Sequence, residues 1–416
     1  MRIFLEVHKP EILNYVIKSN KYIKINILQN IHLIKTVNMK KYKIGIIGYG
    51  GFGKFLHHWW AKLDNVEVAA VADHGITFEN QENFKTYKNW EDLLADTEID
   101  IVSIVTPPGL HAEMACAAMR AGKHVLLEKP IAISKEEAQQ ILQVQRETGK
   151  VITVDHMIRY NPIIQTIQKL GKKNVLGQLR QVVVNNYAQD DALPAEHWFW
   201  NREVSGGIMV EHGVHFFDIV NAIGGQNFTE VYGVSHQRNE QQRDRVAALV
   251  LYDEGLIASY YHAFAGPGFF EQTTIQLSYD LARIEIEGWM PMKGKVKAIV
   301  NSEARTSFST LPGWSETEAE SFEKMRDVSR PEGWGSSKEN AAQDQDLIKI
   351  GGVSYNADQM ISGTFEIQKT KGEVYGSCVQ MILSDIIKKI ENENHELTIT
   401  AENAFEALKI AVLASK

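Results

Sequence analysis

The sequence predicts an α/β protein of two domains, a first domain built on a parallel sheet and a second α/β domain with a large, mostly antiparallel sheet. From Lys43 the chain alternates short apolar runs with stretches of helical spacing, which is typical of a parallel sheet covered by helices. From about Arg159 apolar runs follow one another with few long helices between them, which indicates antiparallel strands. At 416 residues, 44% of them hydrophobic, the chain is long enough for two cores.

The composition argues against several classes of protein. A formal net charge of −8 disfavours nucleic acid as a partner, because phosphate binding needs a basic face. Cys116 and Cys378 lie far apart and outside any metal-ligand spacing, so we expect neither a disulfide framework nor a metal site. This cysteine usage favours the reducing cytoplasm. No apolar run reaches the roughly 18 residues that a membrane-spanning helix needs.

Residues 1–38 differ in composition from the rest of the chain. They are rich in Ile, Lys and Asn, and carry six basic and two acidic residues, a balance of +4 that leaves −12 for residues 39–416. Charges recur throughout, so the segment lacks the uninterrupted apolar core of a signal peptide. Because Met39 directly precedes the first apolar strand, we interpret residues 1–38 as a leader that is disordered or reflects a wrongly assigned start codon. A genuine N-terminal extension is the alternative.

The pattern of residues 39–158 predicts that they form the first domain, with six parallel strands. The helix signals are Asn89 as an N-cap, Ser134 with Glu137 as a capping box, and Gly122 and Gly149 as helix ends. Residues 74–87 are too short and polar for a full crossover helix, so the second crossover is expected to be trimmed. The strand runs that can be named are 43–48, 66–73, 99–108, 123–130 and 151–156, and the expected helices are 51–63, 89–96, 109–122 and 135–149.

Residues 159–416 predict the second domain. One helix, at 211–225, interrupts the strand runs, and residues 301–370 are polar and weakly periodic, so we interpret them as a long insertion. Amphipathic helices are expected at 374–392 and 401–415. The expected strands are 179–189, 229–237, 245–253, 256–264, 273–280 and 282–288.

The glycine run Gly48–Gly53 follows the first strand and opens the first helix, the context of a Rossmann dinucleotide-binding loop. Gly48 would make the tight turn, Gly50 would let the backbone approach a pyrophosphate, and Gly53 would let helix and strand pack closely. Asp73 lies 20 residues after Gly53, at the end of the second strand. An acid there accepts hydrogen bonds from the adenosine ribose and repels a 2′-phosphate, so we expect NAD rather than NADP. The alternative is an ordinary strand–turn–helix with a surface aspartate.

Three further stretches resemble the Gfo/Idh/MocA family of oxidoreductases, which includes glucose–fructose oxidoreductase and inositol dehydrogenase. They are VTPPGLHAEMACAAMRAGKHVLLEKPIA (105–132), RYNP (159–162) and SGGIMVEHGVHFFD (205–218). With the glycine run they cover most of residues 42–290 in the family's order. The resemblance implies an active cleft between a Rossmann domain and a domain for substrate binding and oligomerisation.

The resemblance also implies which residues contact the cofactor. Lys129 would reach nicotinamide and substrate, where a lysine can hydrogen-bond the reacting hydroxyl and relay its proton. Thr106 and Pro107 would border the nicotinamide, with Pro107 as the candidate for a cis X-Pro bond. His111 is either a cofactor contact or only the start of the next helix. The expected cofactor contacts are Gly48, Gly50, Gly51, Phe52, Gly53, Asp73, Thr106, Pro107, His111, Glu128 and Lys129.

Glu211 and His215 are four residues apart and share one helix face, and Asp218 can also meet His215. The resemblance places His215 at the general acid–base histidine of the family, and Glu211 where the family usually has an aspartate that contacts substrate and histidine. We expect Lys129 and His215 to handle the proton and Glu211 to orient. His212, about 100° away around a helix, is the second candidate for the acid–base role. An ordinary helix histidine and a solvated acid are the alternative.

Four residues are expected to line the substrate cleft, together with Glu211 and His215. Arg159 and Tyr160 can hydrogen-bond polyols, and the aromatic faces of Trp198 and Trp200 can pack on sugar rings. Both tryptophans serve equally well as core residues.

The activity that the resemblance implies is NAD-dependent hydride transfer to or from a carbinol of a sugar, a sugar derivative or a cyclitol. An NAD-retaining glycosidase of the same fold and a non-catalytic NAD-sensing regulator are the alternatives. Family members pair through the open face of the sheet, so we expect a homodimer or homotetramer.

Overall fold

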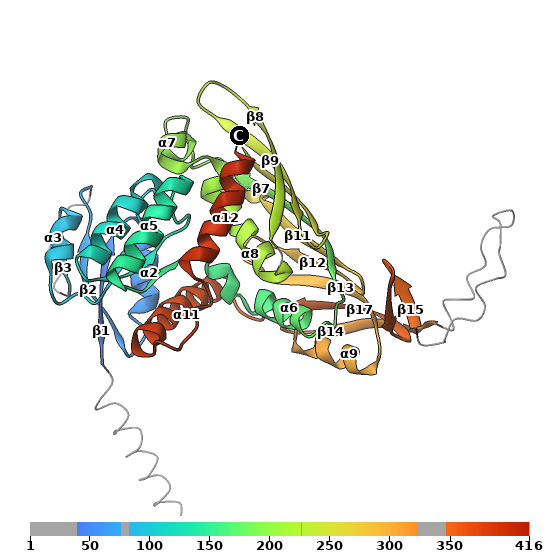
Figure 1. Cartoon of the computed structure of the whole chain (residues 1–416). Helices are drawn as coiled ribbons and strands as arrows, with labels where there is room; N and C mark the ends of the chain where they lie inside the picture. The colour runs from blue at the N-terminus through green and yellow to red at the C-terminus, as the bar shows by residue number, and fades with distance from the viewer. Residues whose placement is uncertain (1–39, 76–82, 226, 323–346, 416) are drawn as a thin grey trace, which may run out of the picture.

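The computed structural model describes residues 40–75, 83–225, 227–322 and 347–415. These form a six-stranded sheet, a nine-stranded sheet and a separate two-stranded hairpin. Figure 1 shows the first sheet and its helices on one side of the molecule, the second sheet on the other, and the C-terminal helices between them. The predicted fold class is confirmed.

The first sheet is parallel throughout and has the strand order β3-β2-β1-β4-β5-β6. Six strands were predicted, but a range was named for only five of them. The remaining strand is Lys85–Tyr87, within the segment that we expected to be a trimmed crossover. The other five strands overlap the predicted runs, and β4, β5 and β6 are shorter than predicted. The bounds are β1 Tyr42–Ile47, β2 Val66–Ala72, β3 Lys85–Tyr87, β4 Ile101–Ile104, β5 His124–Leu127 and β6 Ile152–Val154.

Among the described residues, four helices connect these strands, and their ends follow from local sequence. Ser134 accepts a hydrogen bond from the Glu137 backbone N–H, and Gly149 ends that helix with a left-handed φ of 64°. The predicted capping box is modified, because the Glu137 carboxylate accepts from the Ile133 N–H rather than from Ser134. The bounds are α2 Gly51–Trp60, α3 Trp90–Ala95, α4 His111–Arg120 and α5 Lys135–Thr148.

The strand order of the first sheet reverses between β1 and β4, which lie side by side. Ligands of open α/β sheets bind outside the carboxyl ends of the strands at such a switch point. The glycine run follows β1 at this place. The topology therefore places any nucleotide at the carboxyl edge, facing the second sheet.

The second sheet has the order β14-β17-β13-β12-β11-β7-β10-β9-β8 and is antiparallel apart from the β7–β10 pair. Burial alternates along its strands, so one face is covered and the other is open. The bounds are β7 Leu179–Gln189, β8 Phe228–Gln237, β9 Arg243–Tyr252, β10 Ile257–Gly266, β11 Gln272–Tyr279, β12 Ala282–Glu287, β13 Lys293–Val300, β14 Ser315–Ser321 and β17 Gln359–Glu366.

The segment 301–370 differs from the long insertion that we expected. Its described parts hold α9 (Ser302–Ser307), the hairpin of β15 (Leu347–Ile350) and β16 (Val353–Asn356), and the two sheet strands β14 and β17. β17 pairs with β13 over eight residues, so the end of the segment is part of the main sheet. Residues 323–346 lie outside the described residues, as do 1–39.

Helices of the second domain lie between its sheet and the first domain (Figure 1). They are α6 (Pro162–Lys172), α7 (Arg202–Ser205), α8 (Val214–Gly224), α11 (Lys371–Glu391) and α12 (Ala401–Ala414). Helix α11 packs against α2, and Trp60 donates its indole N–H to the Val379 carbonyl at 2.8 Å. Gly376 allows this approach, because a Cβ there would lie 2.0 Å from the Trp59 ring. The end of the chain thus holds both domains together.

Candidate active site

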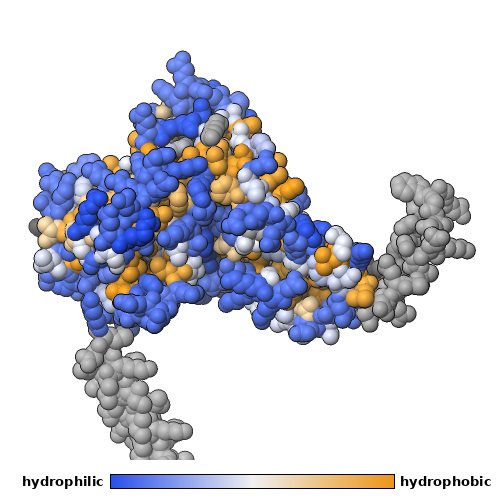
Figure 2. All heavy atoms as spheres, viewed as in Figure 1, coloured by the Kyte–Doolittle hydropathy of each residue, from blue (hydrophilic) through white to orange (hydrophobic). Residues whose placement is uncertain are grey.

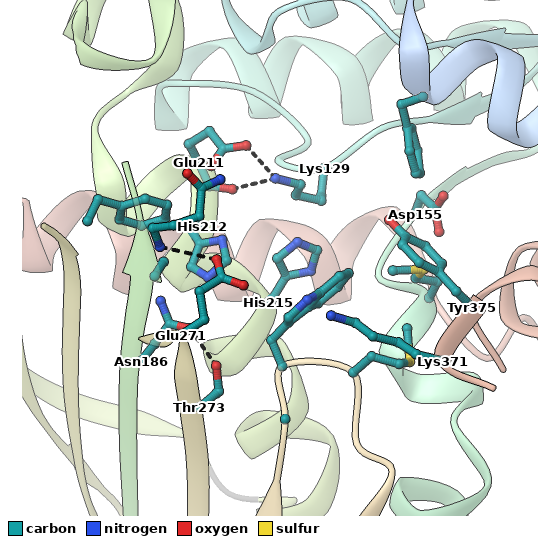
Figure 3. Close-up of a pocket in the computed structure, with 18 of the residues that line it drawn as sticks. Lys129, Asp155, Asn186, Glu211, His212, His215, Glu271, Thr273, Lys371 and Tyr375 are labelled. Atoms are coloured by element: carbon teal, nitrogen blue, oxygen red, sulfur yellow. Dashed lines mark hydrogen bonds and ion pairs between the residues drawn. The ribbon is translucent and has the colours of Figure 1, made fainter. Parts of the chain in front are cut away.

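A cavity of about 670 Å³ lies where the carboxyl edge of the first sheet meets the closed face of the second. Its wall is formed by the end of β4, by the residues after β5 and β6, by strands β7 and β11, and by the start of α11. Figure 3 shows side chains from both domains converging on it. Lys129, Glu211 and His215, the three residues that we expected to be catalytic, all line it.

The glycine run forms a tight turn between β1 and helix α2. Gly48 has a φ of 92°, and a Cβ on Gly53 would lie 2.2 Å from the Gly48 carbonyl oxygen, so the turn and helix α2 are in close contact. A Cβ on Gly50 or Gly51 would meet nothing within 4 Å. The open space therefore lies at the N-terminus of α2, where unpaired backbone N–H groups favour an anion.

Asp73 lies at the end of β2, beside this loop. Its Oδ2 accepts a hydrogen bond from the Tyr49 N–H and its Oδ1 accepts one from the Gly75 N–H, both at 2.8 Å. The carboxylate is thereby fixed next to the glycine turn, at the position that meets an adenosine ribose in Rossmann domains. The following residues, 76–82, are outside the described part of the chain.

The segment after β4 contributes Thr106 and Pro108 to the cavity wall, but not Pro107. The expectation of a cis bond at Pro107 is wrong, because the cis bond of the described residues is Lys129–Pro130. His111 begins α4 and is fully buried, with its ring nitrogens 2.7 Å from the Pro130 carbonyl oxygen and 2.9 Å from that of Thr106. It joins the loop after β4 to the loop after β5 and does not line the cavity. This supports the interpretation that His111 only begins the helix.

Lys129 and Glu211 come from different domains and meet in the cavity. The ammonium group donates to the Glu211 carboxylate at 2.6 Å and to the Glu211 backbone carbonyl at 2.7 Å. Both side chains are only about one-seventh exposed, with 14% for the lysine and 15% for the glutamate. Figure 3 shows both contacts as dashed lines. The longer glutamate thus reaches the lysine directly.

Glu211 and His212 lie in a wide π-helical turn, Met209–Gly213, which leads into α8. The sequence predicted a regular helix there, with His212 pointing well away from the face of Glu211 and His215. In the structure all three side chains line the cavity, and the rings of His212 and His215 lie 5.8 Å apart between centroids. His212 therefore shares the cavity with Glu211 and His215, where the sequence had placed it on another helix face.

The ring of His215 is buried, and its Nδ1 has no hydrogen-bond partner among the described residues. Burial lowers the pKa of His215 well below its ordinary value, and the charge of Lys129 lowers it further. Burial likewise lowers the pKa of His212 to about 3. Both imidazoles are therefore neutral near pH 7, and a neutral imidazole can take a proton from a hydroxyl.

Asp218, Arg159 and Tyr160 do not reach the cavity. Arg159 donates from Nε and Nη2 to the Asp218 carboxylate at 2.7 and 2.6 Å, a buried bidentate ion pair. Tyr160 donates its hydroxyl to Asp385 at 2.6 Å. These three residues therefore hold the start of α6, helix α8 and helix α11 together, where the sequence had suggested contacts with substrate or with His215.

The two tryptophans have different surroundings. Trp198 lines the cavity and is 37% exposed. Trp200 is 8% exposed, donates its indole N–H to the Leu193 carbonyl at 3.1 Å and lines a separate, smaller pocket. Only Trp198 is therefore in place to pack on a substrate in this cavity.

Several cavity residues were missed by motif reasoning. Asn186 and Thr273 pair in register on β7 and β11, and the threonine hydroxyl donates to the Asn186 side-chain oxygen at 2.8 Å. Strand alternation places both on the covered face, but no motif marks them. Other missed residues include Asp155, Glu271, Trp289, Lys371 and Tyr375.

Two family models match the chain. Residues 42–156 match the oxidoreductase family with an NAD-binding Rossmann fold, and residues 164–284 match the Gfo/Idh/MocA C-terminal domain. Residues 164–284 include the π turn Met209–Gly213, helix α8 and the strands from β7 to the start of β12. The two matches follow the same order as the two domains described above.

Curated relatives match about half of the chain. The 1,5-anhydro-D-fructose reductase of Ensifer adhaerens is 28% identical over 204 residues, which are 47% of this chain and 60% of the relative. The levoglucosan dehydrogenase of Pseudarthrobacter phenanthrenivorans is 26% identical over 210 residues, 45% of this chain and 52% of the relative. The chain thus spans about half the length of the curated relatives that it matches.

Solved structures share the fold over most of the chain. Levoglucosan dehydrogenase in complex with NADH and L-sorbose superposes with a TM-score of 0.65 and 17% identity, covering 90% of this chain and 96% of the other. The myo-inositol 2-dehydrogenase of Lactobacillus plantarum gives a TM-score of 0.62 at 17% identity, with 89% and 95% covered. Together with the family matches, these findings show that the chain belongs to the Gfo/Idh/MocA family of oxidoreductases.

Proposed function

We propose that this protein is an NAD-dependent oxidoreductase that transfers a hydride between nicotinamide and a carbinol or carbonyl of a sugar, a sugar derivative or a cyclitol. The observation that carries the proposal is the meeting of the Lys129–Glu211 pair with the neutral His215 in one cavity at the carboxyl edge of the first sheet. Relatives named for work on anhydrosugars and inositols support the substrate class.

The cofactor would be held by the residues of the carboxyl edge. The open space over Gly50 and Gly51 suits the pyrophosphate, and the fixed carboxylate of Asp73 suits the ribose of NAD and disfavours the 2′-phosphate of NADP. Solved relatives are complexed with NADH, whereas one curated relative is named as an NADP(+) enzyme. Bound there, nicotinamide supplies the hydride acceptor or donor.

The side chains account for the proton. When a carbinol is oxidised, its C–H electron pair leaves as hydride and its O–H proton must go to a base. His215 accepts that proton, and Lys129 donates a hydrogen bond to the substrate oxygen while Glu211 orients the ammonium group. Asn186, Thr273 and Trp198 supply the polar and aromatic surface that a polyol needs.

We also propose a homodimer or homotetramer assembled through the open face of the second sheet. Large apolar side chains are exposed there, and Tyr232 and Leu249 pair in register at 57% and 41% exposure. Figure 2 shows apolar residues gathered at the upper right, over this sheet.

Cys116 and Cys378 are buried and unpaired, which supports the cytoplasm as the location. The described residues contain no helix long and apolar enough to cross a membrane.

Fluorescence titrations with NADH and NADPH, followed by a screen of inositols, aldoses and glycosides with NAD⁺, test the proposal. We expect tighter binding of NADH and formation of NADH with at least one polyol. Binding of neither cofactor would remove the proposal. Release of a sugar from a glycoside without net NADH formation would replace it with the NAD-retaining glycosidase.

A further inference from the structure

Two buried carboxyl groups lie side by side next to Lys129, and the proposed proton transfer does not use them. Glu128 directly follows β5 and Asp155 directly follows β6. These strands are parallel neighbours in which Leu127 pairs with Val154, and the Asp155 N–H donates to the Leu127 carbonyl at 2.7 Å. Glu128 and Asp155 therefore lie at the same carboxyl edge of the sheet, each one residue beyond the last paired residues of β5 and β6.

Both groups line the active cavity but are nearly hidden from solvent, with Glu128 9% and Asp155 2% exposed. The Oε1 of Glu128 and both carboxyl oxygens of Asp155 are buried, and apart from each other they have no side-chain partner among the described residues. Two neighbouring carboxylates in such surroundings repel each other and lose their hydration. A single proton shared between them removes the repulsion and gives one oxygen a donor.

The surroundings favour placing that proton on Glu128. Burial raises the pKa of Glu128 well above its ordinary value, and the charge of Asp155 raises it further. Burial also raises the pKa of Asp155, but a hydrogen bond from Glu128 acts in the opposite direction. Asp155 is therefore the charged partner and Glu128 the neutral one.

The other titratable groups facing the pair do not supply the proton. Burial raises the pKa of Tyr375 above its ordinary value and that of Cys378 to about 12, so both residues of α11 stay neutral. The pKa of Tyr160 is likewise raised by burial. The charge of Lys129 lowers the pKa of both carboxyl groups, but its ammonium group donates its hydrogen bonds to Glu211.

We propose that Asp155 keeps Glu128 protonated and neutral, so that Glu211 remains the carboxylate partner of Lys129 and the ammonium group stays at the reacting centre. An ionised Glu128, adjacent to Lys129 in the chain, would compete with Glu211 for the same cation. Asp155 and Glu128 are thus positioning residues, which act through Lys129. The inference rests on the proposed function only for the statement that Lys129 meets the substrate.

The protonated carboxyl can be observed without any substrate. Infrared spectra of the unliganded protein, recorded across a pH series, should show the C=O stretch of a buried carboxylic acid at neutral pH. The band should be absent in Glu128→Gln and should disappear at lower pH in Asp155→Asn than in the wild type. A band that persists in Glu128→Gln, or that titrates unchanged in Asp155→Asn, would overturn the assignment. Asp280→Asn is the control, because Asp280 is buried on the second sheet with Arg180 and Tyr355.

Turnover then tests the positioning role. Asp155→Asn should lower kcat about tenfold at neutral pH, change the KM for NAD⁺ much less, and move the alkaline fall of kcat to lower pH. Glu128→Gln/Asp155→Asn should recover most of that loss, because a carboxamide cannot ionise and compete for Lys129. If kcat of the double variant is no higher than that of Asp155→Asn, Asp155 has only a structural role and the proposal is wrong. If the wild type oxidises no polyol, the proposed function fails while the infrared result still decides the state of the pair.

Discussion

Lys129 and Glu211 are separated by 82 positions in the chain, yet their charged groups lie 2.6 Å apart in a largely buried setting. A buried ammonium needs such a partner, because an unpaired charge there would lose its hydration without compensation. His215, by contrast, stays uncharged, because burial and the nearby lysine both disfavour its protonated form. The pair can therefore hold a substrate oxygen, and the neutral imidazole, whose Nδ1 has no hydrogen-bond partner among the described residues, is the base that we propose for its proton.

Replacing either of the side chains that we propose as catalytic should separate binding from chemistry. Lys129→Ala and His215→Ala should each keep NADH binding but lower kcat by about 100-fold or more, the usual contribution of a positioned acid–base group. Steady-state kinetics with an active polyol, together with an NADH titration, measure both quantities. Full activity in either variant would remove that residue from the mechanism, and Trp200→Phe, outside the cavity, serves as the control.

Asp73 offers a test of cofactor choice. Asp73→Ser removes the charge that repels a 2′-phosphate, so the ratio of the NADPH and NADH dissociation constants should fall by about tenfold, as the like-charge contact is lost. Titration of both cofactors against wild type and variant measures this ratio. An unchanged ratio would mean that another group reads the ribose.

At the scale of the elements, the β1–α2 turn and the start of α8 show how far sequence reasoning reaches. The glycine run, the strands and most helix ends were predictable, because each depends on residues that are neighbours in the chain. The π turn at Met209–Gly213 and the pairing of Arg159 with Asp218 were not, because they depend on packing between distant segments. For the same reason Asp155 and Asn186 entered the site only with the structure.

Two glycines of the β1–α2 turn should respond differently to the same substitution. Gly53→Ala places a Cβ 2.2 Å from the Gly48 carbonyl oxygen and should lower the free energy of unfolding by about 2–4 kcal/mol. Gly50→Ala meets no atom within 4 Å, so the fold should tolerate it while NADH affinity falls about tenfold or more. Thermal denaturation and an NADH titration distinguish the two. Equal stability of both variants would contradict the close contact.

At the scale of the whole molecule, the C-terminal helices make contacts within the chain, whereas the open face of the second sheet is left uncovered. Helix α11 packs on α2 through Trp60 and Gly376, so the end of the chain fixes the two domains around the cavity. The open face of the second sheet instead leaves apolar side chains uncovered. Covering such a face is what association of copies of the chain would accomplish.

A charge on the open face should disrupt that association. Val234 is 67% exposed on β8, so Val234→Glu should leave the fold intact while shifting the protein towards a smaller species. Light scattering coupled to size-exclusion chromatography gives the mass of both forms. A monomeric wild type, or an unchanged mass in the variant, would contradict assembly through this face.

Buried histidines should make the fold sensitive to acid. Burial lowers the pKa of His156 and His111 to about 4 and that of His262 well below its ordinary value. Between about pH 6.5 and 4 the unfolded chain therefore binds protons that the folded chain does not, so the free energy of unfolding should fall as pH falls. Urea unfolding at pH 7 and pH 5 measures this loss, which His262→Gln should reduce. A stability that is constant or rises towards pH 5 would contradict the burial of neutral imidazoles.

The most direct test of the central claim is whether hydride passes between nicotinamide and a polyol in this cavity. Wild type and His215→Ala are incubated with NAD⁺ and each of a panel of inositols, aldoses and anhydrosugars, and NADH absorbance is followed with time. The account predicts NADH formation by the wild type with at least one polyol and a rate about 100-fold lower in the variant. A wild type that binds NADH but reduces NAD⁺ with none of them, or a variant as fast as the wild type, would contradict it.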